Sequence, residues 1–182
     1  RGLGDVYKRQ IKNCLNFGSQ EKPDVMGEFV ECINGMKEAC EFLNFPVVSG
    51  NVSFYNETNS KSIFPTPVIG GIGLFDNLNK IINMKTKKVG NLIIIVGKTF
   101  GHLGQSSFMR EIYSVNEGSP PEINLTNEKN NGQSILNLIN LNLVASCHDV
   151  SSGGILISLA EMSMASMSVS YTHLTLPTSR SV

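Results

Sequence analysis

The chain has 182 residues, of which 41% are apolar and 16% charged, and its 15 basic and 15 acidic side chains cancel to a formal net charge of zero. This balance argues against nucleic-acid binding, which needs a clustered basic surface. The apolar content is too high for a disordered chain, and no segment approaches the roughly 18 to 20 unbroken apolar residues that span a bilayer. We therefore expect a soluble globular protein, one medium domain or parts of two, with neither nucleic acid nor membrane as a partner.

The cysteines give no sign of a metal site or a disulfide framework. The four of them, Cys14, Cys32, Cys40 and Cys147, form no C-x-x-C pair and have no histidine at ligand spacing. We expect reduced thiols and a cytoplasmic location.

Both ends differ from the interior. Residues 1–10 and 169–182 show neither helical nor strand periodicity, and they resemble translated sequencing-adapter sequence. We expect both to be non-native, the alternative being a genuine flexible tail at each end. Tyr171, His173 and Arg180 therefore receive no functional weight.

The first half of the interior predicts a helix between strands. After the short apolar run 14–17, apolar residues recur at three- and four-residue steps over 25–43, which predicts an amphipathic helix ended by Pro46. The β-branched segments 46–55 and 66–75 predict two strands separated by a polar turn. Three glycines inside the second of them indicate that a ligand or another backbone comes close.

The second half predicts a separate domain after a polar connector over 76–88. Its first element is the apolar run 91–96, which is typical of a strand buried on both faces. The remaining expected elements are a short helix over 106–113, a surface excursion over 118–131, a helix over 135–143, a short buried strand over 144–147 and a helix over 155–164.

The string from Ser49 to Glu57 is the strongest candidate for chemistry. A glycine such as Gly50 lets phosphate oxygens approach the main chain, and the amide oxygen of Asn51 is a hard ligand suited to phosphate-bound magnesium. On a strand, Asn51 and Ser53 project to the same face and could reach one ligand. The alternative is an ordinary turn flanked by strands.

Three other strings are weaker candidates. Asn13 and Asn16 bracket an apolar run before a glycine, and their alternative role is to satisfy local backbone groups. The string 148–154 places a histidine and an aspartate before Ser-Ser-Gly-Gly at a helix start, which favours an anion or, alternatively, is a simple helix cap with a packed histidine. The glycine-rich string 101–104 matches no established phosphate loop.

Taken together, the strings resemble one enzyme family. They are N-C-L-N-F-G at 13–18, E-K-P-x-V-M at 21–26, P-V-V-S-G-N-V-S-F-Y-N-E-T at 46–58, P-T-P-V-I-G at 65–70 and H-D-V-S-S-G-G at 148–154. In this order they resemble the second half of small-type phosphoribosylformylglycinamidine synthase, over roughly residues 11–168. The last string is shared more widely with aminoimidazole ribonucleotide synthetase, selenophosphate synthetase and thiamine monophosphate kinase.

The resemblance implies an ATP-dependent carbon–nitrogen ligase of purine biosynthesis. Such an enzyme converts formylglycinamide ribonucleotide, glutamine and ATP to formylglycinamidine ribonucleotide, glutamate, ADP and phosphate. ATP phosphorylates the amide oxygen, because that oxygen is otherwise a poor leaving group, and ammonia then displaces phosphate. The implied partners are a glutaminase subunit, which supplies the ammonia, and a small accessory subunit.

The resemblance also implies roles for four residues. Asn13 and Gly50 would contact ATP, Asn51 would bind Mg²⁺ and Ser53 would touch the substrate. Position 13 is commonly Asp in relatives, and an Asn there supplies no negative charge. No catalytic residue is expected in this chain, because the family's catalytic histidines and acidic magnesium ligands lie in the first half of the full-length protein.

The implied fold is α/β (α+β), the end of a ferredoxin-like nucleotide-binding domain followed by an α/β sandwich domain of the aminoimidazole ribonucleotide synthetase type. We expect these domains at 11–88 and 89–168, both partial. The chain would then be a fragment that contributes part of a composite site and is inactive alone. The alternatives are a non-catalytic nucleotide-binding scaffold half, or an ATP-binding protein related to aminoimidazole ribonucleotide synthetase or selenophosphate synthetase.

Overall fold

The computed structural model describes residues 9–75 and 77–166. The predicted non-native ends therefore lie outside the described residues, except for Arg9 and Gln10, which begin a strand. The chain divides into two compact units, residues 1–78 and 79–182. Each unit is described by itself below.

A three-stranded sheet forms the first unit, with β1 (Arg9–Asn16) between β2 (Val47–Ser53) and β5 (Thr66–Gly73). β1 pairs in parallel with β2 and antiparallel with β5. The strands predicted over 46–55 and 66–75 are thus present. β2 starts one residue later than predicted, β5 starts at its predicted residue, and both end two residues earlier. β1 was not predicted from the sequence, because polar residues at 12, 13 and 16 interrupt its apolar residues.

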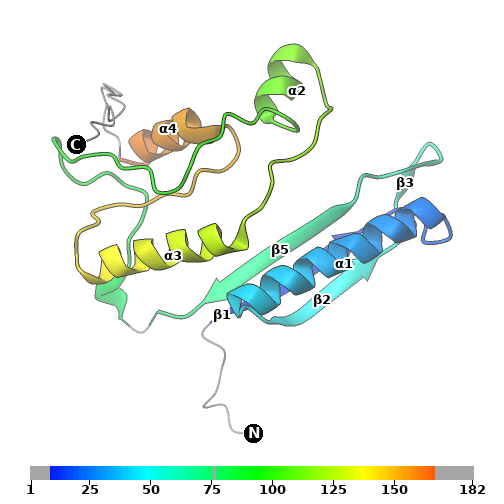
Figure 1. Cartoon of the computed structure of the whole chain (residues 1–182), viewed down its shortest axis with the longest axis horizontal. Coiled ribbons are helices and arrows are strands. Elements are labelled where there is room, and N and C mark those ends of the chain that lie inside the picture. Colours follow the sequence, from blue (N-terminus) through cyan, green and yellow to red (C-terminus); the bar gives the residue numbers. More distant parts are fainter. Residues whose placement is uncertain (1–8, 76, 167–182) are drawn as a thin grey trace, which may run out of the picture. The chain divides into compact units, whose positions relative to one another are not determined.

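Helix α1 (Pro23–Leu43) lies along this sheet (Figure 1). Proline is favoured in a first turn, where its missing N–H would have no helical partner. The helix ends at Asn44, whose left-handed φ of 52° directs its backbone N–H to the carbonyls of Cys40 and Glu41. Pro46, the predicted stop, is therefore not what ends the helix, which closes two residues earlier.

The core of the first unit lies between α1 and β1. Leu15 and Phe17 are fully buried there with Val25 of the helix. The ring of Phe17 meets that of Phe29 edge to face, with centroids 5.3 Å apart, and Phe54 completes the aromatic cluster. Burial of these apolar groups holds α1 against one face of the sheet.

A small hairpin replaces part of the polar turn expected between β2 and β5. Its strands are β3 (Glu57–Thr58) and β4 (Lys61–Ser62), which pair antiparallel. Asn59 and Ser60 connect them with φ values of 51° and 61°. Two successive positive φ values are typical of the tight turn that matches the twist of a hairpin.

The regular elements among the described residues of the second unit are all helices, joined by long irregular segments. The unit contains α2 (Ser107–Tyr113), α3 (Leu125–Asn140) and α4 (Gly154–Ser166), and the short 3-10 turn η2 (Leu78–Lys80) lies at the division between the units. The helices predicted over 106–113 and 155–164 are present. α3 begins ten residues before its predicted start, because the Asn124 side chain caps it by accepting from Asn127 N–H at 2.9 Å.

The two strands predicted in the second unit are wrong. Residues 91–96 and 144–147 adopt no strand, and Leu92 and Ile94 are 87% and 76% exposed. A strand is stable only when a neighbour completes its hydrogen-bond ladder, and the second unit's described residues include no strand to pair with these segments. One isolated bond joins Cys147 N–H to the Asn83 carbonyl at 3.1 Å.

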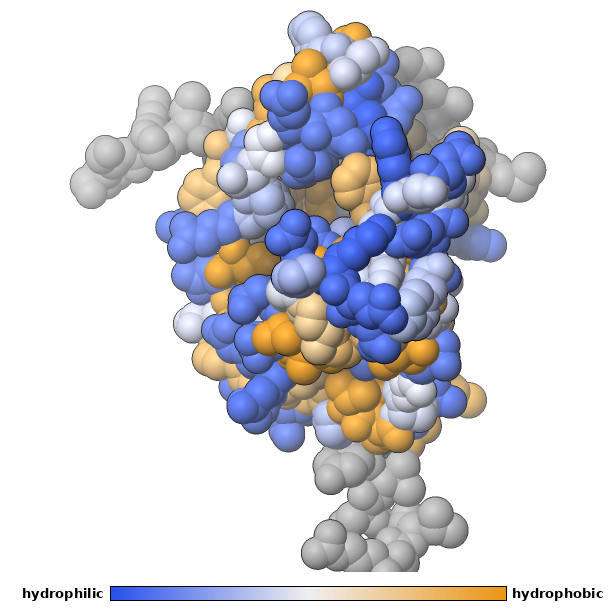
Figure 2. All heavy atoms as spheres, turned by 90° about the vertical axis from the view of Figure 1, so that its right-hand side faces the viewer, coloured by the Kyte–Doolittle hydropathy of each residue, from blue (hydrophilic) through white to orange (hydrophobic). Residues whose placement is uncertain are grey.

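Many apolar side chains lie at the surface between polar ones (Figure 2). Phe64 and Phe75 are among the exposed large apolar residues. Among the described helices, none has both the length and the apolar composition needed to cross a membrane.

Candidate nucleotide-binding site

The register of β1 and β2 sorts the four predicted site residues onto two faces of the sheet. Asn13 pairs with Gly50, and Cys14 pairs with Asn51. Partners in a parallel pair project to the same face, and successive residues alternate. Asn13 and Gly50 therefore share the face of the buried Leu15, covered by α1, which we call the helix face. Asn51 and Ser53 share the opposite face, which we call the far face.

On the helix face, the Asn13 side chain fills the space that Gly50 leaves. A Cβ built on Gly50 would lie 2.8 Å from Asn13 Cγ and 3.2 Å from the Asn13 carbonyl oxygen, with the amide oxygen closer still. Contacts shorter than about 3 Å between such atoms are repulsive. The gap predicted to admit a phosphate is thus occupied by a side chain of the neighbouring strand.

On the far face, polar side chains lie next to one another across the two strands. Ser53 pairs with Asn16, and Asn51 is exposed beside the exposed Cys14. The Asn16 amide nitrogen lies 3.4 Å from the Thr66 carbonyl oxygen on β5. The prediction that Asn51 and Ser53 project to the same face is confirmed, and hydroxyl and amide groups are available there to an oxygen-rich ligand.

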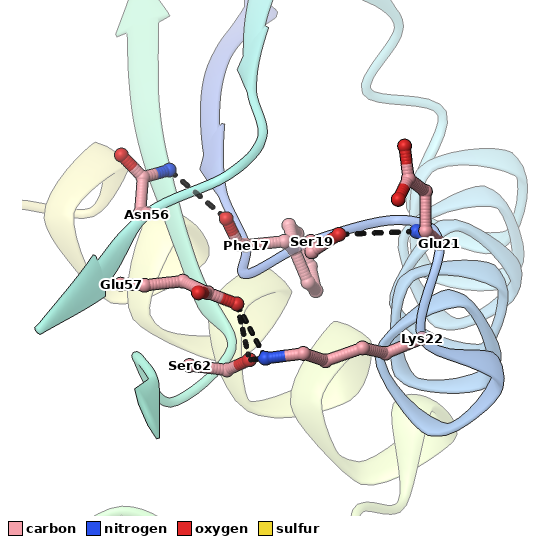
Figure 3. Close-up of polar contacts among 7 residues, drawn as sticks. All are labelled: Phe17, Ser19, Glu21, Lys22, Asn56, Glu57 and Ser62. Carbon is pink, nitrogen blue, oxygen red and sulfur yellow. Dashed lines mark hydrogen bonds and ion pairs between the residues drawn. The ribbon is translucent and has the colours of Figure 1, made fainter. Parts of the chain in front are cut away.

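Asn56, which lies in the predicted string 49–57 but was assigned no role from the sequence, contacts the Ser53 hydroxyl. Its amide nitrogen lies 3.0 Å from the carbonyl oxygens of both Phe17 and Ser53, and 3.1 Å from Ser53 Oγ (Figure 3 shows the Phe17 contact). A left-handed Tyr55, with φ of 62°, turns the chain so that this amide points back to the strand. The Y-N-E string could have indicated the turn but not the contact.

An ionic cluster fastens the hairpin to the start of α1 (Figure 3). Lys22 Nζ lies 2.5 Å from Glu57 Oε1 and 3.2 Å from Ser62 Oγ. The hydrogen bond from Lys22 holds the pKa of Glu57 below its usual value, with further lowering by Ser62. Gly18 permits this packing, because a Cβ there would lie 2.5 Å from Ser62 Cβ. We call Lys22, Glu57 and Ser62 the clasp.

In the second unit, His148 bridges two carboxylates. Its Nε2 lies 2.9 Å from Glu161 Oε2 of α4, its Nδ1 lies 3.2 Å from Asp149 Oδ1, and its side chain is 13% exposed. The hydrogen bond with Glu161 raises the pKa of His148 against the opposing effect of burial, and Asp149 adds to the rise. The Asp149 carbonyl accepts from Ser158 Oγ at 3.1 Å, so this string secures the start of α4.

The residues around Asn51 fit a metal only in part. Among residues 9–75 and 77–166, no cluster of three or more His, Cys, Asp or Glu side chains could hold a metal ion. Asn51 offers one neutral oxygen, and magnesium in proteins usually takes one or two carboxylates with phosphate oxygens and water. Asn51 therefore suits a single position in a coordination shell completed by phosphate and by groups other than those described.

Comparisons with known proteins identify the family. Residues 8–75 match the model for the N-terminal domain of AIR synthase related protein, and residues 88–178 match the model for its C-terminal domain. The predicted α/β class, with two domains of this type in succession, is confirmed.

Relatives with high identity are named phosphoribosylformylglycinamidine synthase subunit PurL. The protein from Pelagibacter ubique is 55% identical over 84% of this chain, that from Bradyrhizobium diazoefficiens 50% over 86%, and that from Parvibaculum lavamentivorans 49% over 85%. In each case the chain spans 21% of the relative's length. By its matches to both domain models, the chain belongs to the AIR synthase-related protein family.

Proposed function

We propose that this chain is a segment of the large subunit of a phosphoribosylformylglycinamidine synthase, an ATP-dependent ligase of purine biosynthesis. The complete enzyme would use ATP and ammonia released from glutamine to convert formylglycinamide ribonucleotide to formylglycinamidine ribonucleotide, ADP and phosphate. The proposal is supported by the identity to proteins named as that subunit. The observation that carries it is the placement of Asn51 and Ser53 together on the far face.

We assign Asn51 as a neutral ligand to phosphate-bound Mg²⁺ and Ser53 as a substrate contact. Both lie at or near the carboxyl end of β2, on the face that α1 leaves uncovered. The ATP contacts at Asn13 and Gly50 stay a prediction. These two residues share the helix face, so a single ligand that also touched Asn51 and Ser53 would have to pass around the edge of β2.

Several further features are proposed for the whole protein. It would act in the cytoplasm with a glutaminase subunit and a small accessory subunit, and its domains would divide near residue 88. The chain alone would be inactive, because such a ligase needs carboxylates to hold its metal, and residues 9–75 and 77–166 contain no cluster of three or more metal-ligating side chains.

The test is a substitution in the full-length subunit that contains this segment. We expect Asn51→Ala to lower ATP-dependent amidine formation with ammonia about tenfold and to raise the magnesium requirement, as loss of one metal ligand does. The matched control is Asn34→Ala, which removes the same group from an exposed position of α1.

The stability of the same variants separates the proposal from its rival. Since Asn51 is exposed and has no core contact, its loss should change the free energy of unfolding by less than about 0.5 kcal/mol. A destabilised Asn51→Ala enzyme with normal ATP and magnesium dependence would contradict the assignment.

A second candidate function, a nucleotide-binding half that only supports the scaffold, is favoured by one observation. The Asn13 side chain fills the gap at Gly50, as expected of a packing contact between the strands rather than an open phosphate site. Under that function, Asn51→Ala and Ser53→Ala would leave turnover unchanged in the full-length enzyme.

A further inference from the structure

We propose that Asn56 is a positioning residue that holds the Ser53 hydroxyl with its hydrogen directed at an acceptor oxygen of the ligand. The inference rests on the proposed function, in which Ser53 contacts the substrate. It adds a residue that acts through Ser53 and specifies what the ligand must present at that point.

The surroundings of the Asn56 amide fix its orientation. Its nitrogen lies 3.0 Å from two main-chain carbonyl oxygens, those of Phe17 and Ser53. Carbonyl oxygens only accept hydrogen bonds, so the NH₂ group and not the amide oxygen must face them. The Phe17 carbonyl oxygen also accepts a hydrogen bond from the Asn56 backbone N–H, at 3.1 Å.

This orientation bears on the role of the Ser53 hydroxyl. The Asn56 amide nitrogen lies 3.1 Å from Ser53 Oγ, and the hydroxyl can in turn donate to the Asn56 amide oxygen over a longer distance of 3.4 Å. An N–H group directed at Oγ uses one of its lone pairs, and a ligand oxygen at ordinary hydrogen-bond distance would compete with the 3.4 Å contact to the Asn56 oxygen for the hydroxyl hydrogen. Ser53 is therefore prepared to donate to a phosphate or carbonyl oxygen.

The clasp fixes the position of Asn56. Glu57, the next residue, is held by Lys22 at the start of α1 and by Ser62 of the hairpin (Figure 3). The Asn56 carbonyl accepts from Ile63 N–H at 3.1 Å on the other side of the hairpin. Because contacts on both sides hold the backbone at Asn56, its amide is presented from a fixed point, as a positioning role requires.

A double-substitution cycle in the full-length enzyme tests the proposal. We expect Asn56→Ala to raise the KM for formylglycinamide ribonucleotide about tenfold with a smaller change in kcat, the factor that corresponds to one ordinary hydrogen bond. In a Ser53→Ala background the same change should leave KM unaltered, because the hydroxyl it acts through is gone. A merely structural role would lower the fraction of active enzyme, hence kcat, equally in both backgrounds.

The outcomes distinguish this inference from the proposed function. If Ser53→Ala alone leaves the KM values for substrate and ATP unchanged, the substrate contact itself is wrong and the inference fails with it. If Ser53→Ala raises a KM but Asn56→Ala multiplies it further by its full factor, only the positioning role is overturned. A rise in the KM for ATP instead of substrate identifies the acceptor as a nucleotide phosphate and supports the positioning role.

A second variant covers the case in which Asn56→Ala does not fold. Asn56→Gln keeps both N–H donors but moves them by one methylene group, so it can still serve the carbonyl oxygens of the turn while losing the contact with Ser53. It should reproduce the rise in KM, and an unchanged KM in a folded Asn56→Gln enzyme would overturn the proposal.

Discussion

Asn13 and Gly50 form one packing unit across β1 and β2, because the Asn13 amide occupies the volume that any side chain at position 50 would need. Both residues lie on the helix face, where Asn13 is partly buried and Gly50 is exposed. A glycine that the sequence predicts for phosphate approach thus has a second and independent reason to be glycine.

Gly50→Ala should destabilise the first unit by about 1 to 3 kcal/mol, the usual cost of forcing an added methyl group into a filled site. Combining it with Asn13→Ala should restore part of the loss by vacating that volume. Gly27→Ala in α1 is the control, since no atom lies within 4 Å of a Cβ there and the change favours helix. Urea unfolding of the four proteins measures each effect, and a Gly50→Ala protein as stable as the parent would contradict the packing.

The clasp should make the first unit less stable in acid. The pKa of Glu57 is lowered, so its pairing with Lys22 stabilises the folded state above the unfolded pKa of a glutamate, about 4.3. That contribution is lost as the pH falls through the lower folded pKa. Glu57→Gln should therefore flatten the acid limb of stability against pH, and Glu38→Gln on the exposed face of α1 should not. Equal acid limbs in the parent and Glu57→Gln would speak against the clasp.

The second unit should respond to pH in the opposite direction. The pKa of His148 is raised, chiefly by Glu161, so the protonated bridge stabilises the unit below the unfolded histidine pKa of about 6.5. This stabilisation disappears as the pH rises through the folded pKa. Glu161→Gln should move the NMR titration midpoint of His148 downward and reduce the loss of thermal stability above neutral pH. An unshifted midpoint in that variant would mean that Glu161 is not the cause.

Phe17 should be the most costly aromatic residue to truncate. It is fully buried and contacts the rings of Phe29 and Phe54, so Phe17→Ala should lower the free energy of unfolding by about 3 to 5 kcal/mol. Phe64→Ala, at a position 81% exposed, is the matched control and should cost less than about 1 kcal/mol. Similar losses in the two variants would contradict the proposed location of the core.

The sequence by itself determined the elements whose signals are local. The three- and four-residue apolar spacing predicted α1, and the capping and periodicity of short segments predicted α2 and α4. The β-branched runs predicted β2 and β5, and alternation along β2 correctly placed Asn51 and Ser53 on one face. These properties depend on neighbours a few residues apart, which the sequence displays directly.

Only the tertiary structure decided which strands form and what their side chains meet. The apolar run 91–96 has every local feature of a strand, yet it forms none, because a ladder requires a partner that local composition cannot supply. The strand register pairs Asn13 with Gly50, and the turn after β2 brings the Asn56 amide to the Phe17 carbonyl. Both contacts join residues distant along the chain. Such contacts arise when pairing and burial select one arrangement among many, and for that reason the division of the predicted site between two faces could not be predicted from its residues alone.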